Sequence, residues 1–414
     1  YVNKGPGRPI FSAEVRAETL AGFACVDAVV INDAPSAESL LRVVRPHVYV
    51  KGQEYAHGGG EIEAERRAVE AGGGTTIFET AGHTVSDADG VASSSRLIQR
   101  HIRHDESRRR WLASARRRGW RAELPSLVQR AAGLSVLFIG EHIVDEYVYV
   151  AALGKPPKEF VIAGLKQETE SFEGGIVAAM RHAQSFVSKV DYLTDRTVTK
   201  TRFVDRAFNR KLFEVYDMDD TPPDAVQEAK SELLIRQLAP GYDVTVVVDF
   251  GHGMLTPRLR QAIMDASNFL AVNSQSNSAN HGFNPITNWR ADYMVCDMPE
   301  ARLAVGERRA DPIACIKRLH QYAPRVIVTA GHDGSYVSNG EPVQVPSFAE
   351  KVVDTMGAGD AFLAVTAPLA ALSDDLELVA FAGNIAGGLK VGEVGHRKAV
   401  DKTAFLRYAD GLLQ

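Results

Sequence analysis

The stretch VVDTMGAGDAFLAV occupies residues 352–365 and joins the end of a short apolar segment to a longer apolar run. Gly357 and Gly359, on either side of Ala358, allow the backbone to turn sharply and to approach a ligand closely. The N–H groups of a helix beginning here would point at one spot that suits an anion, such as a phosphoryl group in transfer. Asp360 stands beside that spot, where it could accept a proton from an attacking hydroxyl. The same pattern also fits a tight turn whose aspartate merely favours a helix N-terminus.

The chain around this turn alternates strand and helix patterns. Near-continuous runs of Val and Ile predict strands that are covered on both faces. Residues 133–414 are therefore expected to form a doubly wound α/β domain that binds its ligands at the carboxyl ends of the strands. The predicted strands are LSVLFIGE (134–141), VTVVVDF (244–250), FLAVN (269–273) and RVIVTAG (325–331), and the clearest helices are 224–238 and 312–322. The segment 197–218 differs, because two strand-like runs flank a polar RAFNR, and it predicts an antiparallel hairpin that could act as a lid.

Composition excludes several classes of protein. The chain has 414 residues, 45% of them hydrophobic and 24% charged, which predicts folded structure and two domains. The net charge of -5 gives no general case for nucleic acid or for an acidic membrane surface. The longest apolar stretch, 361–372, is too short to cross a bilayer. Three widely spaced cysteines argue against a disulfide framework and for a reducing, cytoplasmic setting.

A basic run with interleaved tryptophans lies within residues 105–132. One interpretation is a helix that binds RNA or phosphate, and the other is a linker helix whose tryptophans dock on a neighbour. The second is favoured, because no recognition motif accompanies the arginines. The run contains Arg108, Arg109, Arg110, Arg116, Arg117, Arg118 and Arg121, with Trp111, Leu112 and Trp120 between them.

Residues 1–104 form a separate α/β pattern. Helices are predicted at 13–26 and 36–44, and strands at 26–33 and 47–52. This order is typical of a βαβ unit, so a parallel sheet is expected.

The glycine turn resembles a family signature. DTMGAGDAF is similar to the DTxGAGDxF motif of the ribokinase/PfkB carbohydrate kinases, and six further landmarks follow in the family's order from GEHIVDEY (140–147) to AGNIAGGLKVGEVG (382–395). The resemblance implies a ribokinase-like sheet with a small β lid, ATP as phosphoryl donor and Mg²⁺. No GxxxxGK[ST] pattern occurs, which excludes a P-loop kinase. The implied site residues are Asp145, Gly174, Gly175 and Asp249 for the sugar, Glu300 for the metal, and Thr329, Gly331, Gly334, Asn384 and Gly388 for the nucleotide.

Within this family the lid segment TKTRFVD (199–205) is similar to the heptose-7-phosphate kinases. A phosphorylated sugar needs cationic anchors, and this segment offers Lys200 and Arg202, with Arg206 and Arg210 following. The alternative is a solvated hairpin that merely carries charge.

Several positions depart from the family pattern. Glu141 replaces an aspartate, Ala178 an asparagine, His252 a lysine and Asp297 an asparagine, and NSQSNSAN (273–280) stands where heptose kinases have an Asp-Pro-Lys turn. We therefore expect intact phosphoryl-transfer machinery beside an altered sugar pocket.

The first segment resembles the later part of a cytidylyltransferase-like nucleotidyltransferase, closest to the sugar-1-phosphate adenylyltransferases. NKGPGRPIF (3–11) and GVASSSRLI (90–98) carry the likeness, which implies phosphate binding by Lys4, Arg8, Arg16, Ser93, Ser94 and Ser95. The family's HxGH motif is absent from the 414 residues. Either the motif lies upstream of Tyr1 and this chain is a fragment, or the domain is inactive, and the start at Tyr1 favours the fragment.

These observations predict three segments: a partial nucleotidyltransferase at 1–104, a basic linker helix at 105–132 and a carbohydrate kinase at 133–414. The expected protein is a bifunctional sugar-activating enzyme, cytoplasmic and homodimeric. Its expected partners are a sugar or sugar phosphate and a nucleoside triphosphate, with neither nucleic acid nor membrane. The competing hypothesis is a pseudoenzyme that binds nucleotide or sugar and has a scaffold or regulatory role.

Overall fold

The computed structural model divides the chain into two compact units, residues 1–100 and 101–414. Each unit is described by itself below. The structure describes residues 12–21, 26–34, 36–52, 60–79, 86–87, 90–91, 94–154, 163–207, 210–339, 341–350, 352–392, 395 and 397–414.

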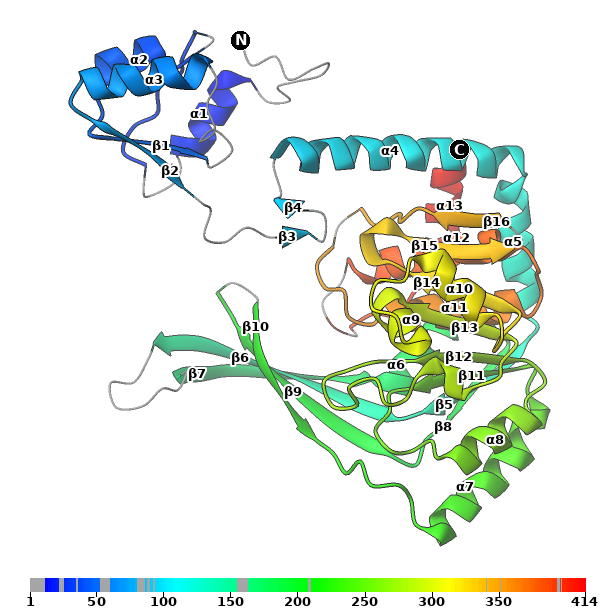
Figure 1. Cartoon of the computed structure of the whole chain (residues 1–414). Coiled ribbons are helices and arrows are strands. Elements are labelled where there is room, and N and C mark those ends of the chain that lie inside the picture. Colours follow the sequence, from blue (N-terminus) through cyan, green and yellow to red (C-terminus); the bar gives the residue numbers. More distant parts are fainter. Residues whose placement is uncertain are drawn as a thin grey trace. The chain divides into compact units, whose positions relative to one another are not determined.

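An eight-stranded sheet forms the centre of the larger unit (Figure 1), in the order β16-β15-β14-β13-β12-β11-β5-β8. The strands from β14 to β8 run parallel, and β15 and β16 add an antiparallel edge. Their bounds are β5 (Ser135–Gly140), β8 (Lys189–Leu193), β11 (Val244–Asp249), β12 (Leu270–Ser274), β13 (Tyr293–Asp297), β14 (Arg325–Thr329), β15 (Ser335–Asn339) and β16 (Glu341–Val345).

Alternation along each central strand explains why helices cover both faces of this sheet. In β5, Val136 and Phe138 join one hydrophobic core, whereas Leu137 and Ile139 join the other. The first core packs against α5 (Trp120–Ala131), α6 (Gly175–Ala183), α11 (Ala358–Ala370), α12 (Leu376–Lys390) and α13 (Lys402–Leu413). The second packs against α7 (Ala225–Leu238), α8 (Pro257–Ala266), α9 (Met298–Val305) and α10 (Pro312–Leu319). The predicted doubly wound α/β architecture is confirmed.

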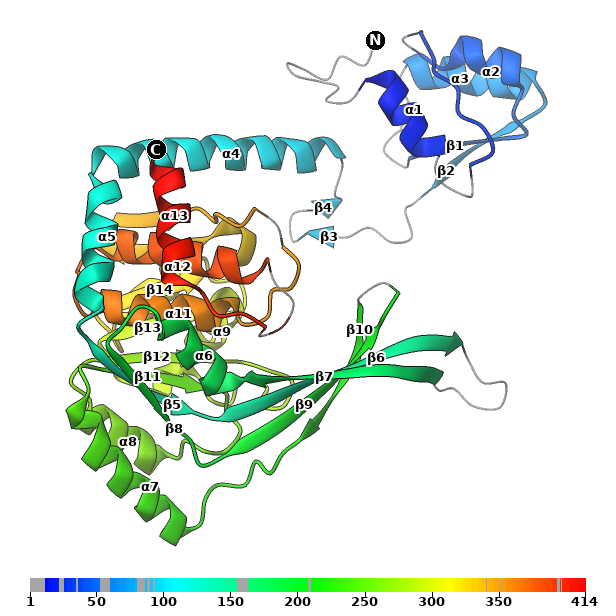
Figure 2. The same cartoon turned by 180° about the vertical axis from the view of Figure 1, so that it is seen from behind.

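A second sheet projects from the main one, as Figure 2 shows, in the order β10-β9-β6-β7. The predicted hairpin is present, since β9 (Thr197–Asp205) and β10 (Arg210–Asp217) pair antiparallel. The sheet is larger than that hairpin, because β6 (His142–Gly154) runs parallel to β9 and pairs antiparallel with β7 (Ala163–Gly174). The chain thus leaves the main sheet directly after Gly140 and enters the lid.

The basic run lies in α4 (Ser94–Arg117) and α5. The ring centroid of Trp111 is 5.4 Å from that of Trp120 and 5.3 Å from that of Phe381. Arg118 pairs with Asp375 at 2.8 Å, and Arg121 pairs with Asp410 at 2.7 Å. The tryptophans therefore dock on the helical layer of the larger unit, and part of the arginine run makes ion pairs with that layer.

The smaller unit contains one parallel strand pair, β1 (Val48–Gly52) with β2 (Thr75–Glu79), so the expected parallel pairing is confirmed. The strand predicted at 26–33 is wrong. Those residues form no strand, and Val30 is 59% exposed, because β1 pairs only with β2 among the described residues. The remaining elements are α1 (Ala13–Ala21), α2 (Glu38–Val44), α3 (Gly60–Ala71), β3 (Ser86–Asp87) and β4 (Gly90–Val91).

None of the helices in the described ranges is long and apolar enough to pass through a bilayer.

Candidate active site

The glycine turn ends where α11 begins. Gly357 is the N-cap of this helix and has φ = +73°, a conformation that few other residues adopt without strain. The first N–H groups of a helix have no partner within the helix, so those of Gly359 and Asp360 face its N-terminal end. The N–H of Ala358 donates to the carbonyl oxygen of Thr355 at 3.4 Å. A Cβ atom added at Gly359 would meet no atom within 4 Å, so open space lies over this part of the turn. Backbone donors beside open space can hold an anion.

Asp360 lies in the first turn of α11 with 7% of its surface exposed. Its Oδ1 accepts a hydrogen bond of 2.6 Å from Nε2 of Gln275, which follows β12 directly. The charges of Asp360 and Lys200 attract each other. The glycine turn, the Asp360 carboxylate and the Lys200 ammonium therefore form one group of neighbouring residues.

The parallel sheet brings the other candidate residues to the same edge. In the strand register Asp249, the last residue of β11, lies opposite Ser274 of β12, and Asp297 of β13 lies opposite Thr329 of β14. All of these strands end at this edge, which is where doubly wound sheets bind ligands.

On the lid side of this site, Asp145 of β6 and Arg202 of β9 form a buried ion pair. Arg202 also lies 3.4 Å from a carboxylate oxygen of Glu214. A Cβ atom at Gly174 would lie 2.2 Å from Oδ2 of Asp145, so only glycine leaves room for this carboxylate. At Gly175, φ is +55° and a Cβ atom would lie 2.5 Å from the carbonyl oxygen of Glu141.

Two further lid arginines were predicted as anchors. Arg206 pairs with Glu168, and Arg210 is exposed at the start of β10. Arg202 and Arg206 are thus already paired with carboxylates inside the protein.

Lys200 of β9 is buried, and its ammonium lies 5.1 Å from the ring centre of Tyr216 and 5.8 Å from that of Phe250. Burial lowers the pKa of Lys200, although the negative charges of Asp145 and Asp360 act in the opposite direction. Aromatic faces partly replace the water that this cation has lost.

Asp249 is 2% exposed and its carboxylate oxygens are engaged within the protein. Oδ1 accepts from the N–H of Gly251 at 3.0 Å and from Asn284 at 3.2 Å, and Oδ2 accepts from Trp289 Nε1 at 3.4 Å. This arrangement makes Asp249 the organiser of the loop that follows β11.

Glu141, a departure from the family pattern, is fully buried beside this loop. Its two oxygens accept from the N–H groups of Phe250 and His252, each at 3.1 Å. Burial, together with the charge of Asp249, raises the pKa of Glu141 to about 7. The His252 ring is also buried, neither ring nitrogen has a hydrogen-bond partner among the described residues, and burial lowers its pKa to about 4.

The predicted nucleotide residues lie on β14, on the turn that follows it and on α12. Gly331 and Gly334 have φ of +56° and +89°, and a Cβ atom at Gly334 would lie 2.1 Å from the carbonyl oxygen of Val345. Asn384 of α12 donates from Nδ2 to the carbonyl oxygens of Val345 and Pro346, at 2.9 and 3.0 Å. Asn384 therefore holds the loop after β16. A Cβ atom at Gly388 would lie 3.2 Å from the backbone nitrogen of Ala349, so Gly388 lets α12 pack closely on the same loop.

Glu300, the predicted metal residue, forms a capping box with Asp297 at the start of α9. Its carboxylate accepts from the N–H groups of Ser276 at 3.2 Å and Asp297 at 2.8 Å. Burial and the nearby charge of Asp297 raise the pKa of Glu300 to about 8. The described residues contain no group of three metal-ligating side chains. The Glu300 carboxylate fits a Mg²⁺ ion that would be held chiefly by nucleotide phosphates and water, since Mg²⁺ needs only one or two protein carboxylates.

The residues predicted for the first segment are only partly described. Arg16 lies on α1, is exposed, and donates from Nε to the carbonyl oxygen of Ser12 at 3.4 Å. Ser94 and Ser95 open α4. Lys4, Arg8 and Ser93 lie outside the described residues.

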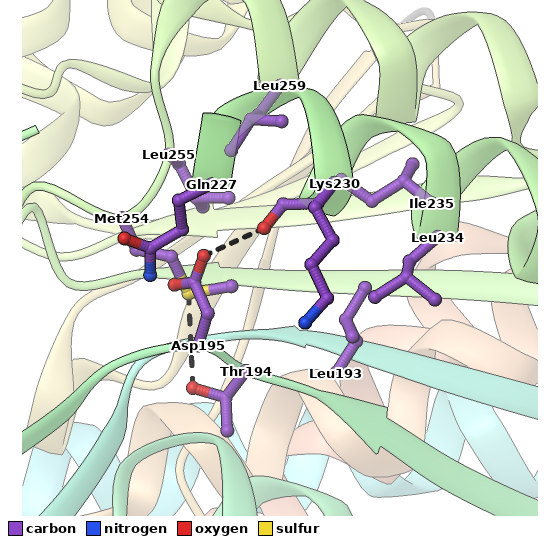
Figure 3. Close-up of a pocket in the computed structure, with 11 residues that line it drawn as sticks. Leu193, Thr194, Asp195, Gln227, Lys230, Leu234, Ile235, Met254, Leu255 and Leu259 are labelled. Carbon is purple, nitrogen blue, oxygen red and sulfur yellow. Dashed lines mark hydrogen bonds between the residues drawn. The ribbon is translucent and has the colours of Figure 1, made fainter. Parts of the chain in front are cut away.

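A cavity of about 200 Å³ lies apart from the predicted site residues, between α7, α8 and the end of β8 (Figure 3). Apolar side chains such as Leu234 and Met254 line it, together with Lys230 and Asp195. Asp195 accepts a hydrogen bond of 2.9 Å from Ser231. None of the residues predicted for catalysis or binding is among its lining residues.

Gln275 and His252 were given no role from the sequence, although both lie in segments that depart from the family pattern. A usable signal was the position of Gln275, one residue beyond a buried strand and thus at the ligand-binding edge of a parallel sheet. Its contact with Asp360, 85 positions away, has no local signature.

Comparison with known proteins supports the family resemblance of the larger unit. Residues 258–403 match the pfkB family carbohydrate kinase model, which confirms the resemblance of the glycine turn. The matched range covers about a third of the chain and includes Glu300, Thr329 and Asp360, whereas Asp145 and Lys200 lie outside it.

Curated relatives are named "Bifunctional protein HldE". The one from Rhodopseudomonas palustris is 25% identical over 306 residues, which are 63% of this chain and 60% of that protein. The one from Aeromonas salmonicida is 27% identical over 261 residues, which are 59% of this chain and 50% of that protein. The chain thus spans between half and two thirds of the length of these relatives.

Solved structures show the fold. Phosphofructokinase-2 from Escherichia coli in complex with potassium superposes with a TM-score of 0.54 at 13% identity, covering 68% of this chain and all of that one. Ribokinase from Thermotoga maritima gives a TM-score of 0.50 at 16% identity, covering 67% of this chain and 99% of that one. The ribokinase-like α/β fold expected for residues 133–414 is confirmed.

Proposed function

We propose that the larger unit transfers the γ-phosphoryl group of ATP to a hydroxyl of a sugar or sugar phosphate similar to heptose 7-phosphate. The observation that carries the proposal is the placement of Asp360 in the first turn of α11, beside the open space over Gly359. The match of residues 258–403 to carbohydrate kinases and the HldE-named relatives supports the substrate class.

In the proposed reaction, Asp360 accepts the proton of the substrate hydroxyl as its oxygen attacks the γ-phosphorus. The bond between the γ-phosphorus and the bridging oxygen breaks, and ADP leaves with that oxygen. The N–H groups at the start of α11 stabilise the negative charge on the transferring phosphoryl oxygens. The proposed contacts of the substrate hydroxyls on the lid side are Asp145 and Arg202.

A bound Mg²⁺ ion would neutralise the phosphate charge of ATP. Glu300 is the protein group that we propose would order it, through water. Thr329 and Gly331 are the proposed contacts of the nucleotide phosphates.

We also propose that the smaller unit is part of a nucleotidyltransferase for a sugar 1-phosphate, which would make the longer protein bifunctional. The HldE-named relatives and the parallel β1–β2 pair support this part. Exposed apolar side chains of β10, among them Phe213 and Val215, support association into a homodimer through the lid.

The test is ATP-dependent phosphorylation of heptose 7-phosphate and of a panel of other sugars, with the product identified by mass spectrometry. Replacing the proposed base, Asp360→Asn, should lower kcat by ~10²-fold or more. Asp265→Asn, an exposed aspartate of α8, is the matched control and should behave as wild type. Equal turnover of Asp360→Asn and wild type would remove Asp360 from the mechanism.

The competing function is a binding protein without turnover. The observation in its favour is that Arg202 and Arg206 already pair with carboxylates of the protein. Tight binding of sugar or nucleotide in calorimetry, with no phosphorylated product on the whole panel, would favour it.

A further inference from the structure

Gln275 is fixed at the carboxyl end of the sheet by its own backbone. Its N–H donates to the carbonyl oxygen of Asp249 at 2.8 Å, and its carbonyl oxygen accepts from Asn280 Nδ2 at 2.7 Å. The second of these contacts comes from a buried side chain. The Gln275 side chain therefore starts from an anchored point rather than from a free loop.

From this point the side chain reaches the first turn of α11. Its Nε2 lies 2.6 Å from Oδ1 of Asp360. An ionised carboxylate can only accept hydrogen bonds, so the amide must present its NH₂ group to it.

The charged groups that act on Asp360 lie on the lid, whereas the neutral amide of Gln275 does not. Lys200 acts on Asp360 from the lid, and Lys200 is itself surrounded by Asp145, Arg202 and Glu214. These groups come from β6, β9 and β10, so their distances from Asp360 depend on the lid. Gln275 directly follows β12 of the main sheet, so its contact with Asp360 involves no residue of the lid.

We propose that Gln275 is a positioning residue that orients the Asp360 carboxylate and keeps it ionised. This inference rests on the proposed function, because it gives Asp360 the role of base. A hydrogen bond to the charged form of a carboxylate favours that form. Loss of the bond should therefore make the base protonate at higher pH.

The experiment measures kcat/KM for heptose 7-phosphate against pH, at saturating ATP, in the full chain. Gln275→Met keeps the length of the side chain and removes the donor. In this variant the acidic side of the pH profile of kcat/KM should shift to higher pH by about one unit. Gln275→Glu sets a second carboxylate against Asp360 and should shift the profile further, since two adjacent carboxylates resist joint ionisation.

The chain offers a matched control in Gln261 of α8. Its Nε2 donates to Oδ1 of Asp265 at 2.7 Å, which is the same chemical pair in an exposed place. Gln261→Met should leave the pH profile unchanged. If Gln275→Met does not fold, Gln275→Asn replaces it, because the shorter amide cannot span the same distance.

A second readout does not require turnover. The ¹³C signal of the Asp360 carboxyl, assigned by its loss in Asp360→Asn, should titrate at higher pH in Gln275→Met than in wild type. An unchanged acidic side of the pH profile and an unchanged titration midpoint would overturn the role of Gln275. Retained activity in Asp360→Asn would overturn the proposed function instead, so the two failures are distinguishable.

Discussion

Two glycines of the site show how the same residue type can serve opposite needs. At Gly174 a Cβ atom would collide with the Asp145 carboxylate at 2.2 Å, so the glycine makes room for a protein group. At Gly359 a Cβ atom would meet nothing within 4 Å, so the room there is empty in the protein itself. Packing requires the first glycine, whereas the space at the second is where we propose that the phosphoryl group binds.

Gly359→Ala tests this difference. The methyl group occupies the space proposed for the phosphoryl group, so kcat/KM for ATP should fall by roughly 10- to 100-fold. The melting temperature should not fall, because alanine favours a helix over glycine and meets no neighbour. Gly411→Ala in α13, which also meets no atom within 4 Å, is the control and should leave the kinetics unchanged. Wild-type kinetics in Gly359→Ala would contradict a phosphate site over this residue.

Glu141 predicts a dependence of stability on pH. Burial raises the pKa of Glu141 from its ordinary value near 4.5 to about 7, so the folded state binds more protons than the unfolded state between these values. The contribution of Glu141 to the free energy of unfolding therefore falls as the pH rises from about 4.5 to about 7, and it stays constant above pH 7.

Glu141→Gln should flatten that part of the profile by an amount on the order of a few kcal/mol between pH 5 and pH 8. The measurement is urea unfolding followed by tryptophan fluorescence, because Trp111, Trp120 and Trp289 all lie in the larger unit. Glu123→Gln, an exposed change on α5, should keep the wild-type slope. Equal slopes in Glu141→Gln and wild type would show that Glu141 is not the group responsible.

At the level of elements, side chains of β6 and β10 join the lid sheet to the glycine turn, and a side chain of β7 joins it to the segment before α13. Lys211 of β10 lies 3.1 Å from Asp354, and Tyr147 of β6 donates to the sulfur of Met356 at 3.2 Å. Glu170 of β7 pairs with Arg397 at 2.6 Å. The lid is thus held against the segment that contains the proposed anion site.

Lys211→Met should loosen this connection. We expect faster hydrogen exchange in β9 and β10 and a severalfold higher KM for the sugar. The unfolding free energy should change by less than about 1 kcal/mol, since the lysine is partly exposed. Lys166→Met on β7 removes an exposed lid charge and should change neither quantity. Unaltered exchange in β9 and β10 would mean that the ion pair does not restrain the lid.

For the larger unit as a whole, α4 and α5 contribute side chains to the hydrophobic core, although residues 105–132 were predicted as a linker helix. Trp120 is 1% exposed and joins the same hydrophobic cluster as Phe381 and Leu363. Residues 101–132 are therefore an integral part of the larger unit.

Trp120→Ala should lower the unfolding free energy of the larger unit by ~3–5 kcal/mol, because it leaves a large cavity. Circular dichroism in urea is the measurement, since the change removes one fluorophore. Arg117→Ala, an exposed change in α4, should stay within about 0.5 kcal/mol of wild type. A loss below about 1 kcal/mol in Trp120→Ala would mean that the helix pair is only loosely attached.

Much of the larger unit could be predicted because its signals are local. The Val and Ile runs of β5, β11 and β14 need burial on both faces wherever they lie, and Gly357 needs a left-handed turn whatever surrounds it. The strand expected at 26–33 failed for the complementary reason. An apolar run becomes a strand only when a neighbouring strand supplies hydrogen bonds, and the described part of the smaller unit places none beside it.

The sequence by itself therefore determined the alternation of strands and helices, the glycine turn, and the residue types available for phosphoryl transfer. Only the tertiary structure decided which of them meet: Arg202 with Asp145, 57 positions apart, and Gln275 with Asp360, 85 positions apart. The physical reason is that turns and strand patterns follow from neighbouring residues. A contact between two side chains depends on sheet order and register, which bring distant parts of the chain to one edge.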